Sequence, residues 1–205
     1  MAAMNVAAIL RPGAPDLAPF ATLAPIVLGG SAFGAAIGSY VGGAQVAYAA
    51  IKMPLFLLGT LGVCVAALGA VAGSSVGPAR AARVAARTVA LTALLLGGLA
   101  PPLFVLGISL PKPEPKGYQA MVLALTLSVA LAGSIAVARM ARELGSRVLA
   151  AAWVGIYGFT GAQAAWLLKP WIGWTLEADR FIPISENLRG NFYEAAFQNV
   201  LNLLR

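Results

Sequence analysis

The side chains able to do chemistry inside the apolar parts of this sequence are all neutral. Histidine is absent from the chain, which removes the commonest general base and the commonest transition-metal ligand. Proton relays and ion-coupled pumps place acids or histidines at membrane depth, and no carboxylate falls within an apolar stretch. We therefore predict a non-enzymatic protein with no cofactor and no metal site. The polar groups inside these stretches are Thr60, Thr92, Thr126, Ser128, Ser134, Tyr157, Thr160 and Gln163.

Three of these polar residues, Tyr157, Thr160 and Gln163, follow one another at intervals of three. On a helix this spacing places them on one face. Such a face lines a polar passage, or it forms a contact in which Gln163 hydrogen-bonds to a neighbouring helix. We favour the contact, because polar side chains commonly join helices within a membrane.

Four apolar stretches without a charged residue must carry these side chains. A helix needs about 20 apolar residues to cross a hydrocarbon core about 30 Å thick. The chain is 60% hydrophobic and 10% charged, whereas an ordinary soluble domain is about 25% charged. We predict an all-α fold, a polytopic membrane helix bundle with four transmembrane helices. The predicted spans are residues 53–73, 88–110, 119–138 and 149–168.

The positive charges lie beside the predicted spans. The net charge is +7, and the basic loops 74–87 and 139–147 are typical of cytoplasmic loops of membrane proteins. Membrane topology therefore accounts for the net positive charge, and we do not predict nucleic acid as a partner. Arginine outnumbers lysine ten to four, which suggests a GC-rich bacterial genome. We expect a multi-pass protein of the bacterial inner membrane, in contact with the lipid bilayer.

One membrane domain, residues 25–171, is expected between an N-terminal segment, 1–24, and a tail, 172–205. Lys52 followed by Pro54 predicts a helix break, because the residue before a proline is disfavoured in helical conformation. The apolar region before this break is then an interfacial or re-entrant helix. A fifth span joined by a tight turn is the alternative.

Glycines recur in this region at a strict spacing of four: Gly30, Gly34, Gly38 and Gly42. On a helix they form one narrow stripe, and small residues in this register let another membrane helix approach closely. We predict a helix-packing groove; the alternative is that glycine is simply frequent, at 23 of 205 residues.

The second predicted span contains Gly97, Gly98, Pro101 and Pro102. These residues are expected to bend or break the helix. The bend is a transporter hinge or, more commonly, an ordinary proline kink.

The fourth span ends in a cluster typical of a headgroup boundary. Indole rings are amphipathic, and a lysine stem can extend its ammonium to water. The predicted interfacial anchor consists of Trp166, Lys169, Trp171 and Trp174.

An amphipathic helix is predicted near the C-terminus. Asn191 is placed to cap it, and Glu194 follows three residues later. The apolar face lies on the membrane, the bundle or a partner protein. It consists of Tyr193, Phe197, Val200, Leu201 and Leu204.

Residues 50–60, which lead into the first span, together with the glycine-proline-interrupted second span resemble bacterial Yip1-like membrane proteins. Residues 166–173 and 190–195 are similar to blocks of an uncharacterised bacterial inner-membrane family. The resemblance implies a multi-span protein without enzyme activity and transfers no site residues.

Two functions follow from these patterns. The first is a non-enzymatic membrane subunit, a scaffold or anchor that assembles with itself or with another membrane protein. The alternative is a small channel or transporter, whose path would be lined by the second span and the face from Tyr157 to Gln163.

Overall fold

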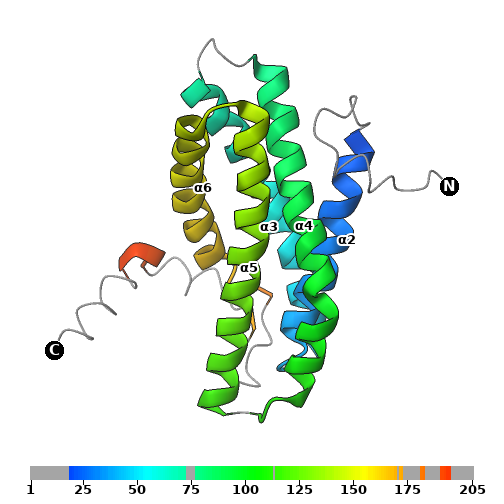
Figure 1. The fold of residues 1–205 in the computed structure, drawn as a ribbon. Helices are drawn as coiled ribbons and strands as arrows, with labels where there is room; N and C mark the ends of the chain where they lie inside the picture. The colour runs from blue at the N-terminus through cyan, green and yellow to red at the C-terminus, as the bar shows by residue number, and fades with distance from the viewer. Residues whose placement is uncertain are drawn as a thin grey trace.

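The computed structural model describes residues 19–72, 77–112, 114–169, 171–172, 181–182 and 190–194, and all regular structure in them is helical. One helical turn covers Phe192–Glu194. The long helices lie side by side in a bundle (Figure 1), which confirms the predicted all-α class. They are α2 (Pro19–Gly38), α3 (Ala44–Ala72), α4 (Pro78–Ser109), α5 (Pro115–Leu144) and α6 (Arg147–Leu167).

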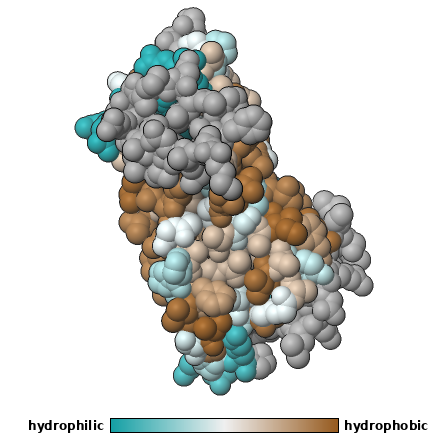
Figure 2. Space-filling view, turned by 90° about the vertical axis from the view of Figure 1, so that its right-hand side faces the viewer, coloured by the Kyte–Doolittle hydropathy of each residue, from teal (hydrophilic) through white to brown (hydrophobic). Residues whose placement is uncertain are grey.

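The last four of these helices are long and apolar enough to cross a membrane. Each overlaps one of the predicted spans almost completely, so the four-span prediction is confirmed. On the face shown in Figure 2, hydrophilic residues gather toward the two ends, and hydrophobic or weakly polar residues lie between them. The chain is a multi-pass membrane protein in contact with lipid.

The turn between α2 and α3 lies earlier than the sequence predicts. The expected break at Lys52 is wrong, because α3 runs without interruption through Pro54. The chain reverses at Gly42 and Gly43, whose φ angles are +84° and +55°. This left-handed conformation is open to glycine and costly for most other residues. Inside a membrane bundle, neighbouring helices can support the backbone group that a proline leaves unpaired.

The expected break in α4 is also absent, because this helix continues through Pro101 and Pro102 to Ser109. Its neighbour α2 packs along it. Packing against a neighbouring helix supports a chain that local propensity alone would interrupt.

The remaining helix ends follow local rules. Prolines begin α4 and α5, where a missing N–H leaves no helical hydrogen bond unmade. Gly145, with φ +68°, ends α5 in the left-handed conformation. The Ser146 side chain then accepts a hydrogen bond from the Leu149 N–H and caps α6.

Helix α2 is a member of the bundle, packed against both α3 and α4. Its residues Ile26, Phe33 and Ile37 are fully buried. At the end of α2, the Tyr40 hydroxyl lies 3.2 Å from the carbonyl oxygens of Pro111 and of Glu114. This contact holds the α4–α5 hairpin against the α2–α3 turn. Beyond this N-terminal group, α5 packs mainly on α4 and α6 mainly on α3.

Candidate functional site

An apolar cavity of about 640 Å³ lies between α3, α4, α5 and α6. It exists because the two outer helices, α5 and α6, pack on different partners and leave space between them. Met53, Leu96 and Val129 are among the side chains that form its walls. Membrane proteins commonly place ligand sites between helices of a bundle, in pockets of about this size.

Among the described lining residues, four carry hydroxyls: Thr88, Thr92, Thr126 and Tyr157. The three threonine hydroxyls donate to the carbonyl four residues earlier in their own helices, at 2.8, 3.0 and 2.8 Å. Their protons are therefore committed, while their oxygens can still accept. No charged side chain is among the described residues that line the cavity.

The three polar residues of α6 that were predicted to share one contact make three different contacts. Tyr157 lines the cavity, and its ring stacks on Trp153 with 4.9 Å between the ring centroids. The Thr160 hydroxyl donates to Ile156 O of its own helix, at 2.9 Å. The Gln163 side-chain oxygen accepts from the Phe192 N–H, at 3.3 Å. Gln163 therefore holds the start of the C-terminal segment against α6.

The glycine stripe faces α3 of the same chain. A Cβ on Gly38 would lie 2.5 Å from Gln45 O, and one on Gly34 would lie 2.6 Å from the Ala49 carbonyl carbon. Real Cβ atoms essentially never come within 3.0 Å of another heavy atom. A Cβ on Gly30 would lie 3.2 Å from Pro54 N, a tight contact but a less severe one. The stripe packs the α2–α3 hairpin, so it is already occupied within the chain.

The placement of Gly42 corrects the predicted stripe. Because α2 ends at Gly38, Gly42 lies in the turn and not on the helix. A second close approach was not predicted: on the other side of α2, a Cβ on Gly97 would lie 2.8 Å from Gly29 Cα. The pair Gly97 and Gly98 is a sequence signal for such an approach, although the prolines that follow it favour the interpretation as a kink.

The residues of the predicted interfacial anchor do not form one cluster: Trp166 and Lys169 contact each other, whereas Trp171 contacts α3. Lys169 Nζ lies 3.1 Å from the centroid of the Trp166 ring, and burial lowers the pKa of the Lys169 ammonium below its ordinary value. Trp171 instead packs edge-on against Phe56, with 5.7 Å between ring centroids. The Trp171 carbonyl accepts from Gln45 Nε2 at 2.8 Å. Trp171 thus also lines the apolar cavity, and its contact with lipid headgroups stays a prediction. Trp174 is outside the described residues.

The C-terminal helix begins as predicted at Asn191, whose side-chain oxygen accepts from the Glu194 N–H at 2.9 Å. Tyr193 stacks on Phe159 of α6, with 4.6 Å between ring centroids, and its hydroxyl donates to the Phe159 carbonyl. The other predicted face residues lie outside the described residues. They are Phe197, Val200, Leu201 and Leu204.

Lys52 is a buried basic residue whose enclosure the sequence pattern does not predict. Its side chain has no exposed surface, and its Nζ lies 5.4 Å from the centroid of the Phe181 ring. The wrongly predicted helix boundary is the reason, because a lysine at a helix break is expected to reach water, whereas Lys52 lies within α3 and is enclosed.

No family model matches this chain, and neither a curated protein nor a solved structure matches it. The resemblance to Yip1-like membrane proteins therefore stays a prediction. Among the described residues, no three histidine, cysteine, aspartate or glutamate side chains group as metal ligands.

Proposed function

We propose that this protein is a non-enzymatic carrier that binds a neutral, largely apolar molecule within the membrane. The observation that supports this function is the cavity of about 640 Å³ between four helices, whose described lining contains no charged side chain. An ion would lose its hydration there and gain no charged partner. A mostly apolar molecule would gain dispersion contacts along the walls at little desolvation cost.

The hydroxyls narrow the chemistry of this molecule. Because the protons of Thr88, Thr92 and Thr126 are donated to backbone carbonyls, these residues offer acceptor oxygens to a ligand. A long-chain alcohol or amide, with one donor on an apolar body, is complementary to such a site. This proposal is the transporter alternative from the sequence, with the transported molecule now specified as a neutral amphiphile.

A brominated fatty alcohol tests the proposal, because bromine quenches nearby indoles. The chain has four tryptophans, and two of them, Trp153 and Trp171, line the cavity. Trp166→Phe and Trp174→Phe would leave these two as reporters. In detergent micelles we expect quenching that saturates at a low mole fraction of 9,10-dibromo-octadecanol.

A cavity-filling variant, Gly133→Leu, separates the cavity from the general apolar surface. Gly133 lines the cavity, and a Cβ there meets no atom within 4 Å. Displacing about two methylene groups of the ligand costs about 1.6 kcal/mol, or more than tenfold in affinity. Gly62→Leu is the matched control, because Gly62 is also open but does not line the cavity. Equal, unsaturable quenching in both variants would count against the carrier.

A scaffold or anchor in a membrane assembly is the second candidate, favoured by the way the C-terminal segment starts. Phe159 and Gln163 of α6 fix Tyr193 and Phe192 by stacking and hydrogen bonding. Because Tyr193 belongs to the predicted apolar face, this contact anchors the start of that face on α6, and a partner would bind the surface that α6 and this segment form together. That partner would be a second copy or another protein of the bacterial inner membrane. On native gels, Phe159→Ala is expected to release an assembly that the exposed control Val154→Ala leaves intact. Identical migration of the two variants would argue against this role.

A further inference from the structure

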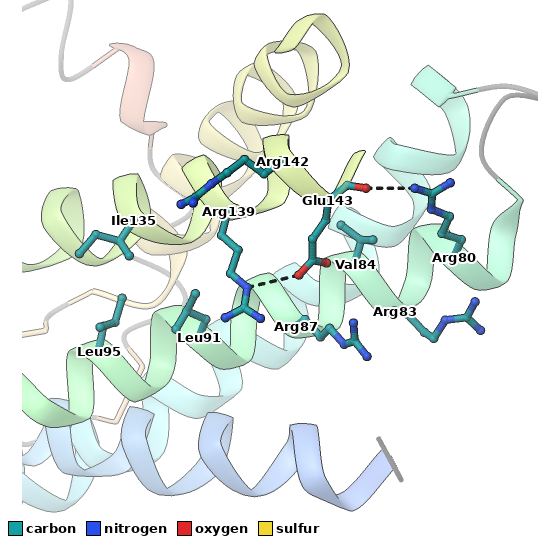
Figure 3. Close-up of a pocket in the computed structure, with 10 residues that line it drawn as sticks. All are labelled: Arg80, Arg83, Val84, Arg87, Leu91, Leu95, Ile135, Arg139, Arg142 and Glu143. Atoms are coloured by element: carbon teal, nitrogen blue, oxygen red, sulfur yellow. Dashed lines mark hydrogen bonds and ion pairs between the residues drawn. The ribbon is translucent and has the colours of Figure 1, made fainter. Parts of the chain in front are cut away.

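A groove between α4 and α5 carries five arginines and one acid. Its volume is about 580 Å³, and its described lining comes from these two helices alone (Figure 3). The lining residues have a net charge of four positive, five arginines less Glu143. The groove is separate from the apolar cavity, which lies on the side of α4 and α5 that faces α3 and α6. The arginines are Arg80, Arg83, Arg87, Arg139 and Arg142.

The groove changes from charged to apolar along its length. On α4, Arg87 is followed by Leu91 and Leu95 at intervals of four, which places all three on one face. On the antiparallel α5, Ile135 precedes Arg139 by the same interval. Both helices therefore present arginine at one end of the groove and aliphatic side chains toward the middle of the bundle (Figure 3).

The one acid among the described lining residues pairs with one of the five arginines. Glu143 pairs with Arg139, with 3.2 Å between Oε1 and Nε. Arg80 reaches only the backbone carbonyl of Glu143, at 3.0 Å. Both members of the ion pair are largely enclosed, with 14% of the Arg139 side chain and 12% of the Glu143 side chain exposed.

Arg139 also has an unmet hydrogen-bond requirement. Its Nη2 atom is buried and has no hydrogen-bond partner among the described residues. A buried guanidinium N–H without an acceptor is costly, because water no longer solvates it. An oxygen bound in the groove would satisfy it.

We propose that this groove binds an anionic phospholipid, with the phosphate among the arginines and an acyl chain along Leu91, Leu95 and Ile135. Guanidinium groups bind phosphate oxygens with paired, charge-assisted hydrogen bonds. Basic pockets between membrane helices are suited to anionic headgroups. A free phosphate ion would occupy only the charged end and leave the aliphatic end uncovered, so the shape of the groove favours the lipid.

The test measures lipid binding to the purified full chain in a neutral detergent by native mass spectrometry. The probes are dioleoyl phosphatidylglycerol, dioleoyl phosphatidylcholine with the same chains, and inorganic phosphate without chains. We expect phosphatidylglycerol to bind more tightly than either of the other two. The variants Arg83→Gln and Arg142→Gln remove exposed arginines of the groove, so folding should survive. Each substitution is expected to weaken the binding of phosphatidylglycerol about fivefold.

Arg147→Gln is the matched control, because Arg147 is also exposed and begins α6 where α5 ends, but does not line the groove. We expect it to change binding less than twofold. Ile135→Ser should weaken the binding of phosphatidylglycerol and leave the binding of inorganic phosphate unchanged. The proposal is overturned if Arg147→Gln costs as much as Arg83→Gln, which would indicate general surface charge. It is also overturned if phosphate binds as tightly as the lipid, or if phosphatidylcholine binds equally well.

Discussion

Replacing Gly34 by alanine should force α2 away from α3 and destabilise the protein by about 1–3 kcal/mol. The added Cβ would lie 2.6 Å from the Ala49 carbonyl carbon, whereas ordinary van der Waals contact begins at 3.4 Å. The atoms it meets belong to the backbone of α3, which has no alternative rotamer. The Ala49 carbonyl oxygen would lie closer still, so the two helices must separate by more than 0.8 Å, the difference between these two distances. A gap of about 0.5–1 Å already loses a quarter to a half of the dispersion energy of each affected contact.

The assay is unfolding by sodium dodecyl sulfate in mixed micelles, followed by circular dichroism. Gly62→Ala is the matched control in the adjoining helix, since a Cβ there meets nothing within 4 Å. Alanine favours helix over glycine by about 1 kcal/mol, so this control should unfold at an equal or higher detergent fraction. If Gly34→Ala and Gly62→Ala unfold at the same midpoint, the inferred close contact between α2 and α3 is refuted.

Three further predictions concern single side chains. Trp153→Phe removes the indole N–H that donates to the buried Cys64 carbonyl at 3.2 Å. It should lower the free energy of unfolding by about 1–3 kcal/mol in the same assay, whereas the control Trp166→Phe should change it little. Cys64 has no exposed surface and should react with maleimide only after denaturation; rapid labelling of the native protein would contradict this packing. Ser146→Ala removes the cap that accepts from the Leu149 N–H and should lower the free energy of unfolding by about 1 kcal/mol. Ser146→Asp should retain stability. An unchanged unfolding midpoint for the alanine variant would show that this cap contributes nothing.

The sequence predicts the spans well because hydrophobicity depends on the solvent around a segment and not on its partner. A run of about 20 apolar residues is recognisable whichever helices surround it. The cap at Asn191 is predictable for a similar reason, since its hydrogen bond to the Glu194 N–H is local. Both features are determined within a few turns of the chain.

The features that the sequence misplaces depend on tertiary contacts. Pro54 signals a break locally, yet α3 continues through it. Gly30, Gly34 and Gly38 signal a close helix contact, but only the structure identifies α3 as the partner. The arginine groove brings together the start of α4 and the end of α5, which are distant in the sequence. Periodicity within one helix contains no information about such pairings.

The position of α2 between α3 and α4 has a consequence for biogenesis. Helices leave the ribosome in order, and N-terminal units generally assemble first. The hairpin of α2 and α3 can close as soon as residues 19–72 are inserted, and α4 completes a three-helix unit when Ser109 follows. The apolar cavity lacks the walls that α5 and α6 contribute until these two helices arrive. The three-helix unit can therefore pack in the bilayer before the cavity is complete, and any lipid that covers its α3 and α4 walls is displaced when the last two helices dock.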